Sequence, residues 1–448
     1  MGRIFGTDGV RGIANEKLDV ELALAISRAA GMIIKNETEG KPKVIVGRDT
    51  RLSGTMLEAA VAAGLSSVGC DVELLGVVPT PAVAYLVTKL GVAGGVMITA
   101  SHNPFEYNGI KYFGSTGFKL TDEQEERIEG IVLDCKEPIE LAATGEIGRI
   151  THNTEAAELY VEHIASTVGD LSGIKIAVDC ANGASFATAK KIFAKVKAEA
   201  TFLNCEPDGT NVNRNCGSLH IDALGEYVKE NGFDIGVAFD GDADRCLAVD
   251  ENGELIDGDM LMAILAKRFK EEGRLNKNTL IPTIMSNMGL FKFAEENGIS
   301  CYPTKVGDRY VLERMLEKGC HIGGEQSGHL IFLEHATTGD GQLSAVQILN
   351  IIRDTGRSLD ELASQIEIFP QVLKNVKVSA FGKHRLAEDE DIRLAIEAAE
   401  KELGANGRVL VRASGTEPLV RVMLEGREKE QIENLATMIA DIVKERLI

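Results

Sequence analysis

A serine that could act as a nucleophile follows a short apolar run of the chain. Ser101 lies in the sequence TASHNP, directly after the strand-like run GGVMITA at 94–100. Proteins with α/β folds place reactive side chains at the carboxyl ends of strands, so the Ser101 hydroxyl could attack a substrate, with His102 or another base beside it. A Ser/Asn/Pro turn is the structural alternative. The motif is not a GxSxG elbow, which disfavours an esterase.

Three aspartates alternate in the loop DGDADR, which follows the apolar run DIGVAFD at 234–240. Carboxylates at 240, 242 and 244 can converge on one hard cation, and oxygen ligands suit Mg²⁺ or Ca²⁺. Mg²⁺ is favoured if a phosphate completes the coordination. A solvated Asp-Gly turn is the alternative. An EF-hand is excluded, because its sixth position would be Arg245 rather than glycine and strands flank the loop.

A glycine-rich loop later in the chain carries groups suited to sugar hydroxyls. The sequence GGEQSGH at 323–329 places Glu325 and Ser327 among glycines that allow a close approach. Lys305 and Arg309 add cationic groups at another strand end. A glycine-rich turn is the alternative, and by itself this loop is a weak indication.

The loop RASGTEP at 412–418 is suited to phosphate. Backbone N–H groups, hydroxyls and guanidinium groups in one turn can surround a phosphate. The loop is not a Walker A motif, since GK[ST] is absent, and a hairpin turn with surface arginines fits equally well. The residues that would contact the phosphate are Arg412, Ser414, Gly415, Thr416 and Arg421.

Three further glycine-containing segments have compositions that suggest loops but do not point to a particular chemistry. The N-terminal sequence GTDGVRG at 6–12 and the sequence GRDTR at 47–51 each place a cation in a loop. Gly339-Asp340-Gly341 suggests no role beyond a turn at the start of a helix.

Short apolar strands alternate with helical patterns, which indicates α/β layers with helices packed on sheets. The predicted strands lie at 43–47, 71–76, 94–100, 175–180, 198–204, 234–240, 279–285 and 301–306. The predicted helices lie at 55–69, 82–91, 121–133, 290–298, 308–319, 340–355 and 388–403. The sequence at 246–256 is typical of a hairpin that turns at Glu251-Asn252-Gly253.

Polar, glycine-containing stretches and the change of pattern near Phe369 divide the chain into four expected domains. These are three α/β domains at 1–150, 151–256 and 257–368, and a C-terminal α+β domain at 369–448. Each domain carries one of the four main motifs, which points to a cleft shared by all four. We therefore predict three similar α/β domains with mixed sheets and a C-terminal α+β domain around a central cleft.

Composition narrows the class of protein. The 448 residues carry a net charge of −20, which disfavours nucleic acid and anionic membranes as partners. None of the eight cysteines forms a CxxC pair, so we expect free thiols in a reducing cytoplasm. No run of about 20 apolar residues is present, and we expect no membrane span.

In this order, TASHNP, DGDADR, GEQSGH and RASGTEP resemble the four signatures of the α-D-phosphohexomutase superfamily, and the resemblance covers the whole chain. FGTDGVRG, TKVGDRYVLE and the SGTEPLVRVM tail resemble its bacterial phosphoglucosamine mutase branch. Two positions depart from that branch, which commonly has proline at Ala413 and often serine at Thr99. The first departure removes rigidity but no ligand, and the second blurs the assignment within the superfamily.

The resemblance implies that glucosamine 6-phosphate and glucosamine 1-phosphate are interconverted through a bisphosphorylated sugar, which also serves as the activator. Ser101 would carry the phosphoryl group as phosphoserine, and Asp240, Asp242 and Asp244 would hold Mg²⁺ together with a phosphate oxygen on Ser101. Arg245 would steady the phosphoserine, Glu325 and Ser327 would bind sugar hydroxyls, and the 412–421 loop would bind the other phosphate. The candidates for proton transfer or charge stabilisation, which the sequence does not rank, are Arg11, Lys111, His102 and His329.

Three alternatives stay open at this point. The same chemistry could act on glucose or mannose phosphates, as in phosphomannomutases and phosphoglucomutases. A sugar-phosphate sensor would not need Ser101 together with all three aspartates, and a phosphatase would release inorganic phosphate. We expect a phosphosugar substrate as the partner, with a homodimer as an option.

Overall fold

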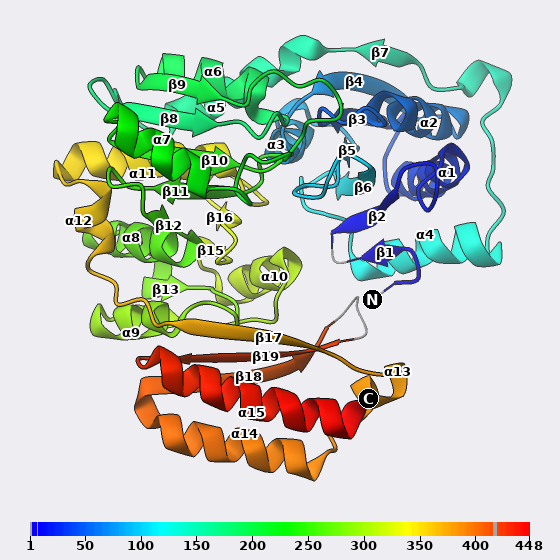
Figure 1. Ribbon diagram of the computed structural model, residues 1–448. Coiled ribbons are helices and arrows are strands. Elements are labelled where there is room, and N and C mark those ends of the chain that lie inside the picture. Colours follow the sequence, from blue (N-terminus) through cyan, green and yellow to red (C-terminus); the bar gives the residue numbers. More distant parts are fainter. Residues whose placement is uncertain (1, 7, 415–418) are drawn as a thin grey trace. The chain divides into compact units, whose positions relative to one another are not determined.

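The computed structural model describes residues 2–6, 8–414 and 419–448. The chain divides into two compact units. The first contains residues 1–285 and 298–365, and the second contains residues 286–297 and 366–448. Figure 1 shows the elements of both units in chain order.

The first unit begins with a mixed seven-stranded sheet (Figure 1). In spatial order its strands are β1 (Phe5–Gly6), β2 (Gly9–Ile13), β6 (Tyr107–Gly114), β5 (Gly94–Ile98), β3 (Lys43–Arg48), β4 (Asp71–Val77) and β7 (Ile150–His152). Strand β3 runs parallel to β4 and β5, whereas β6 runs antiparallel to β2 and β5. Strand β7 pairs with β4, so this sheet continues past residue 150.

Alternating side chains of β3 give this sheet two buried faces. Val44 and Val46 belong to an apolar cluster with helices on one face. On the other face a Cβ at Gly47 would lie 2.7 Å from Val83, so a helix packs closely against the backbone there. The helices of the first face are α1 (Val20–Asn36), α2 (Gly54–Ser67) and α4 (Asp122–Asp134), and α3 (Thr80–Leu90) covers the second.

A five-stranded sheet follows, with strands β12 (Leu255–Ile256), β11 (Cys246–Val249), β10 (Ile235–Phe239), β8 (Lys175–Asp179) and β9 (Glu199–Leu203) in spatial order. Strand β8 is parallel to both β9 and β10, and β10, β11 and β12 are antiparallel neighbours. The hairpin expected at 246–256 is present, with Gly253 at φ +83 in its turn. The helices of this part are α5 (Ala157–Ser166), α6 (Ser185–Lys195) and α7 (Asp222–Asn231).

The third part of the first unit contains shorter strands than the sequence predicts. Strands β13 (Thr279–Leu280) and β14 (Ser300–Cys301) pair in parallel, and β15 (Ile322–Gly324) and β16 (Leu330–Phe332) form a hairpin. The assigned strands within 279–285 and 301–306 are short because Pro282 has no N–H to donate to the ladder. Pairing resumes beyond Pro282 and Pro303, where Thr283 and Thr304 form an isolated parallel bridge. The helices here are α8 (Gly258–Glu271), α10 (Asp308–Lys318), α11 (Gly341–Thr355) and α12 (Leu359–Ala363).

The second unit is an antiparallel sheet covered by helices. Its strands are β17 (Gln371–Lys377), β19 (Leu419–Gly426) and β18 (Gly407–Ala413) in spatial order. The helices α14 (Glu390–Leu403) and α15 (Lys429–Leu447) share an apolar core with the strands, and α9 (Met288–Glu296) and α13 (Ala380–Arg385) complete the unit. The predicted helix at 290–298 therefore groups with the C-terminal strands. The four domain boundaries and the shared cleft stay predictions.

Among the described residues, no helix is both long enough and apolar enough to cross a membrane. The polar loops of interest begin where β5 and β10 end. Helix α11 packs against β10 and β11, which joins the second and third parts of the first unit. The loops that follow β5 and β10 and the loop between β15 and β16 can therefore meet within the first unit.

Candidate active site

Ser101 lies just beyond the carboxyl end of β5, where its backbone adopts a left-handed conformation with φ +52. Its hydroxyl is buried and donates a hydrogen bond to Asp240 Oδ2 at 2.6 Å. The N–H of Ser101 donates to Thr99 Oγ1 at 2.9 Å, and Thr99 Oγ1 donates to Asp49 at 2.7 Å. The candidate nucleophile therefore contacts the first aspartate of the DGDADR loop although 139 positions separate them.

A buried arginine supports the backbone of residues 99–106, which connect β5 to β6, contain Ser101 and are called here the serine loop. Arg51 is 1% exposed, and its Nε lies 2.8 Å from Asp49 Oδ2. The other guanidinium nitrogens donate to the carbonyl oxygens of Ser101, Asn103, Pro104 and Tyr107. The sequence showed only a loop containing a cation at 47–51, so the role of Arg51 was missed.

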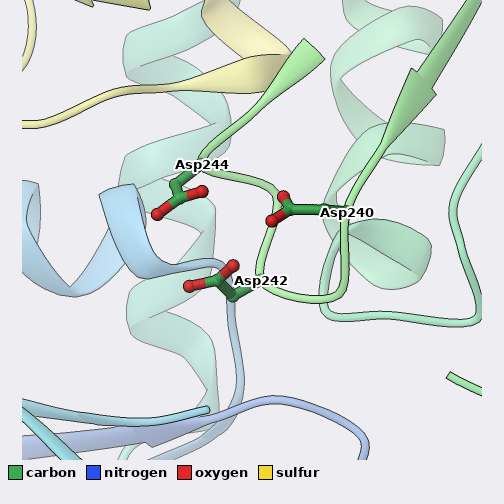
Figure 2. Close-up of side chains that lie close together, drawn as sticks. All are labelled: Asp240, Asp242 and Asp244. Carbon is green, nitrogen blue, oxygen red and sulfur yellow. The ribbon is translucent and has the colours of Figure 1, made fainter. Parts of the chain in front are cut away.

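Residues 240–245, the metal loop, connect β10 to β11 and bring three buried carboxylates together (Figure 2). One oxygen of each of Asp240, Asp242 and Asp244 lies within 4.8 Å of the others. Ala243 turns the loop with φ +55. Asp242 Oδ1 and Asp244 Oδ1 are buried but accept no hydrogen bond from the described residues. These unsatisfied oxygens fit a hard divalent cation, which prefers carboxylate ligands.

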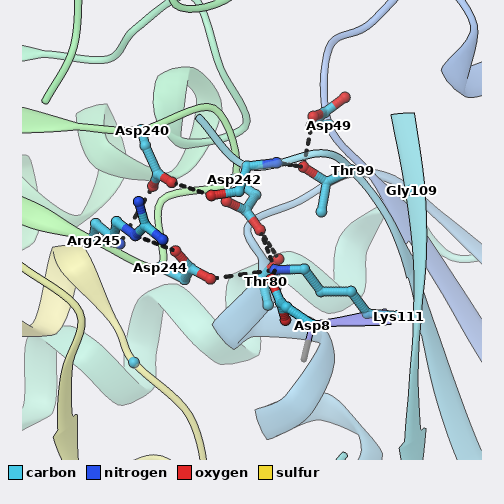
Figure 3. Close-up of polar contacts among 12 residues, drawn as sticks. Asp8, Asp49, Thr80, Thr99, Gly109, Lys111, Asp240, Asp242, Asp244 and Arg245 are labelled. Carbon is cyan, nitrogen blue, oxygen red and sulfur yellow. Dashed lines mark hydrogen bonds and ion pairs between the residues drawn. The ribbon is translucent and has the colours of Figure 1, made fainter. Parts of the chain in front are cut away.

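Lys111, from β6, reaches the metal loop from the first sheet (Figure 3). Its Nζ lies 2.9 Å from Asp242 Oδ2, 3.3 Å from Asp244 Oδ2 and 2.9 Å from Asp8 Oδ2. Burial opposes its charge, but Asp242 and the other carboxylates outweigh burial and raise the pKa of Lys111. Lys111 is therefore a fixed cation beside the three aspartates.

Asp8 connects the candidate cations and was not singled out by the sequence. Besides Lys111, it forms ion pairs with Arg11 and Lys119. Burial opposes its ionisation, but these cations, led by Lys111, lower the pKa of Asp8 well below its usual range. Lys119 also pairs with Asp308 at the start of α10, so the N-terminal loop is tied to the third part of the unit.

His102 lies between the serine and the metal loop. Its Nδ1 is 3.3 Å from Ser101 Oγ and accepts a hydrogen bond from Arg245 Nη1 at 2.9 Å. Burial, with the cations of Arg245 and Arg11, lowers the pKa of His102 to about 4. The ring is therefore neutral at neutral pH. The Arg245 backbone N–H donates to Asp240 Oδ1 at 3.3 Å, and its Nε lies 3.9 Å from Asp244 Oδ1, so Arg245 lies beside both His102 and the carboxylates.

His329 approaches the metal loop from β15–β16. Its Nδ1 lies 3.7 Å from Asp244 Oδ2, and its Nε2 accepts a hydrogen bond from the Gly339 N–H at 3.1 Å. Burial opposes a charge on the ring, but Asp244 and Asp308 raise the pKa of His329. The Gly339 N–H needs a lone pair on Nε2 and so favours the neutral ring. The ring is neutral in this arrangement, because a cationic ring would set its Nε2–H against the Gly339 N–H.

The candidate sugar loop lies in the hairpin between β15 and β16. Glu325 is half-buried, and its Oε1 accepts a hydrogen bond from the Gly307 N–H at 3.0 Å. Ser327 and Lys305 are exposed. Within the described part of the chain only Oε1 of Glu325 accepts a hydrogen bond, which leaves Oε2 available to a hydroxyl.

Arg309 lies against the first sheet's helix α4. Its guanidinium forms ion pairs with Asp122 and with Glu125, the latter at 2.9 Å, and donates to the Leu120 carbonyl at 3.2 Å. Arg309, which was predicted to bind substrate, therefore connects α10 to α4 through these ion pairs.

The candidate phosphate loop belongs to the second unit. Arg412 and Arg421 face each other across β18 and β19, and Ser414 is buried. Arg412 Nε is buried and donates to none of the described residues, and burial together with Arg421 lowers the pKa of Arg412. Two neighbouring guanidinium groups favour the binding of an anion between them. Gly415 and Thr416 lie outside the described residues.

Four family models match the chain in order. They are the phosphoglucomutase/phosphomannomutase alpha/beta/alpha domains I, II and III at 2–138, 158–253 and 257–369, and the C-terminal domain at 373–442. The chain belongs to the phosphoglucomutase/phosphomannomutase family. This confirms the expected fold class of three α/β domains and a separate C-terminal domain.

Individual members of the phosphoglucomutase/phosphomannomutase family are similar over the full length. A phosphoglucosamine mutase from Acetivibrio thermocellus is 52% identical over 448 residues, which is 100% of both chains. The crystal structure of a family protein from Burkholderia thailandensis has a TM-score of 0.85, with 24% identity over 99% of this chain and 98% of that one. An N-acetylphosphoglucosamine mutase from Aspergillus fumigatus, solved with GlcNAc-6P and magnesium, has a TM-score of 0.70, with 18% identity over 99% and 96%.

Proposed function

We propose that the protein interconverts glucosamine 6-phosphate and glucosamine 1-phosphate. The observation that carries this proposal is the contact of Ser101 Oγ with Asp240, in a loop whose Asp242 and Asp244 keep unsatisfied buried oxygens. A hydroxyl beside a cation site is suited to phosphoryl transfer. The choice of sugar is supported by the 52% identical phosphoglucosamine mutase.

Ser101 is the phosphoryl carrier in this proposal and is active as phosphoserine. A hydroxyl of the sugar monophosphate attacks the phosphorus, the new sugar O–P bond forms, and the Ser101 Oγ–P bond breaks. The hydroxyl proton passes to a nearby base, and the product of this half-reaction is a bisphosphorylated sugar. In the second half the other phosphoryl group returns to Ser101. The bisphosphorylated sugar would also recharge an unphosphorylated enzyme, as an activator.

Asp240, Asp242 and Asp244 would hold Mg²⁺, which offsets charge on the phosphoryl group during transfer. Magnesium in the Aspergillus fumigatus relative supports this choice of metal. Lys111 and the Arg245 guanidinium add positive charge beside the same loop, next to Asp242 and Asp244 respectively. We expect a chelator to abolish turnover and added Mg²⁺ to restore it; activity that survives chelation would contradict the metal assignment.

The remaining groups bind the substrate. Glu325 and Ser327 would accept and donate hydrogen bonds to sugar hydroxyls in both orientations of the substrate, and Lys305 and Arg309 are further proposed contacts. The phosphate that is not being transferred would bind the residues Arg412, Ser414, Gly415, Thr416 and Arg421. For proton transfer the proposal keeps the four groups Arg11, Lys111, His102 and His329.

Two wider expectations remain proposals. The free thiols at all eight cysteines support a reducing cytoplasm as the compartment. A homodimer stays a prediction, which sedimentation of the purified protein would test.

A panel of sugar phosphates tests the proposed function. Purified protein, activated with a hexose bisphosphate, is assayed with the 1- and 6-phosphates of glucosamine, glucose and mannose. We expect the highest kcat/KM with the glucosamine phosphates. A clear preference for glucose or mannose phosphates would support the phosphomannomutase/phosphoglucomutase alternative, and release of inorganic phosphate without isomerisation would indicate a phosphatase.

A further inference from the structure

The segment Gly339-Asp340-Gly341, called here the G-D-G segment, leads into α11 and contacts two parts of the candidate active site. All three residues are buried. None of them belongs to a motif that the proposed function uses. Their contacts nevertheless join His329 to the metal loop.

Gly341 contacts the backbone of the metal loop. Its N–H donates a hydrogen bond to the Ala243 carbonyl at 3.0 Å. A Cβ at this position would lie 2.2 Å from the Arg245 carbonyl oxygen, so only glycine allows the two backbones to approach this closely. The position of Ala243, between two of the aspartates, is thereby tied to the start of α11.

Gly339 contacts the ring of His329. Its N–H donates to Nε2 at 3.1 Å, and a Cβ on Gly339 would lie 2.5 Å from both Nε2 and Cε1. The N–H requires a lone pair on Nε2, so the proton of the neutral ring is on Nδ1. Nδ1 faces Asp244 Oδ2 at 3.7 Å. The backbone of Gly339 therefore selects the tautomer that turns its N–H towards the metal loop.

Asp340 keeps the segment in place between these two contacts. Its carboxylate caps α11 by accepting the Leu343 N–H at 2.9 Å. The buried hydroxyl of Tyr160, from α5, donates to the same carboxylate at 2.9 Å. The segment is thus held by the helix that follows it and by a helix of the second part of the unit.

We propose that the G-D-G segment is a positioning element that holds His329 as the Nδ1–H tautomer against Asp244 and fixes the metal loop through Gly341. In this arrangement Nδ1 of His329 faces Asp244, and Nε2 accepts the Gly339 N–H and lies 3.7 Å from Asp308 Oδ2. The inference therefore replaces the proton-transfer role kept for His329 above with that of a positioning residue that acts through Asp244. Partners that orient metal-ligating carboxylates and their neighbours affect metal affinity and turnover strongly. The inference rests on the proposed function only for its effect on turnover.

The tautomer is measured directly by nitrogen NMR of protein labelled with ¹⁵N-histidine. The His329 signals are identified by their loss in His329→Gln. We expect a protonated, pyrrole-type Nδ1 and a pyridine-type Nε2 in the wild-type protein. Protonation at Nε2 instead would overturn the proposal. The spectrum is recorded without substrate, so it decides the tautomer even if the panel of sugar phosphates shows that the protein is not a mutase.

Gly339→Ala tests the effect on turnover, because its Cβ displaces the His329 ring. We expect kcat to fall roughly 10- to 100-fold, KM for the sugar phosphate to stay about the same, and the Nδ1–H signal pattern of His329 to be lost. Gly145→Ala is the matched control, since a Cβ there meets nothing within 4 Å. A folded Gly339→Ala with the wild-type spectrum and kcat would overturn the proposal. If this variant does not fold, the wild-type spectrum still decides.

Discussion

Charge controls the reaction centre at the scale of single residues. Burial and the charges of Asp244 and Asp242 raise the pKa of Asp240 to about 8. Carboxylates packed this closely cannot all ionise unless a cation compensates them. Lys111 supplies part of that compensation, and the unsatisfied oxygens of the metal loop leave a place for more. The arrangement fits the proposed binding of a cation and a phosphoryl group.

The carrier role of Ser101 gives a direct prediction. Ser101→Ala removes the oxygen that accepts the phosphoryl group, so mutase activity should be lost. Mass spectrometry of the wild-type protein should find one phosphate on the peptide that contains Ser101. The exposed Ser115 gives the control Ser115→Ala, which should keep full activity. Near-wild-type turnover of Ser101→Ala after stringent purification would contradict the assignment.

His102 gives a prediction about acid stability. Its pKa of about 4 in the folded protein lies below the ordinary value of 6.5, so the unfolded chain binds more protons between these values. The stability contributed by the neutral ring is complete above about pH 6.5 and is lost as the pH falls towards about 4. His102→Gln should therefore reduce the loss of stability between about pH 7 and about pH 5. Urea unfolding midpoints at both pH values measure it, and an identical loss in both proteins would contradict the prediction.

At the scale of strands and helices, neighbouring elements hold the loops that carry the reactive side chains. The serine loop is not held by its own residues alone: Arg51, in the segment between β3 and α2, donates to its carbonyl groups. The metal loop is likewise held from outside, by Lys111 of β6 and by the start of α11. Each reactive side chain therefore depends on an element distant from it in the sequence.

Replacing Arg51 tests this dependence. Arg51→Met leaves Asp49 as an uncompensated buried charge and removes the donors to four carbonyl groups, so local stability should fall by about 3–5 kcal/mol. Hydrogen exchange of the peptide that covers residues 99–107 measures the opening of the loop. Arg314, which is on the surface and pairs with Glu317, provides the control Arg314→Met, with an expected change below about 0.5 kcal/mol. Unchanged exchange in Arg51→Met would show that the loop holds itself.

At the scale of the whole molecule, the net charge works against the proposed substrate. The chain carries −20, whereas sugar phosphates are anions. Long-range repulsion slows their approach, and the local cations Lys111 and Arg245 act only at short range. Binding must therefore be decided inside the site.

Salt should consequently assist the encounter. Raising the ionic strength from about 10 mM to about 150 mM shortens the Debye length from ~30 Å to ~8 Å, which screens the repulsion more than the short contacts. We expect kcat/KM for a sugar phosphate to rise over this range, measured at constant Mg²⁺. A steep fall in kcat/KM would show that attraction to the local cations dominates the approach.

The sequence predicted most long elements closely, because their patterns are local. The helix expected at 308–319 is α10, and the strand expected at 43–47 is β3. The strands expected at 279–285 and 301–306 are interrupted rather than continuous, because Pro282 has no N–H to donate, and their pairing resumes at Thr283 and Thr304. Helix α1 and strand β6 were not anticipated, although β6 supplies Lys111.

Within the site, the sequence pattern predicts the convergence of groups that are near one another along the chain. Asp240, Asp242 and Asp244 occupy one short loop, and their convergence follows from that spacing. The folded chain was needed to show that Ser101 meets Asp240, that Arg309 pairs with Glu125, and that the Gly339 N–H donates to His329 Nε2. The physical reason is that backbone pattern reports local geometry, whereas contacts between distant segments depend on how sheets and helices pack. A glycine has no side chain that a sequence pattern could use, so its close contact with another backbone is seen only in the folded structure.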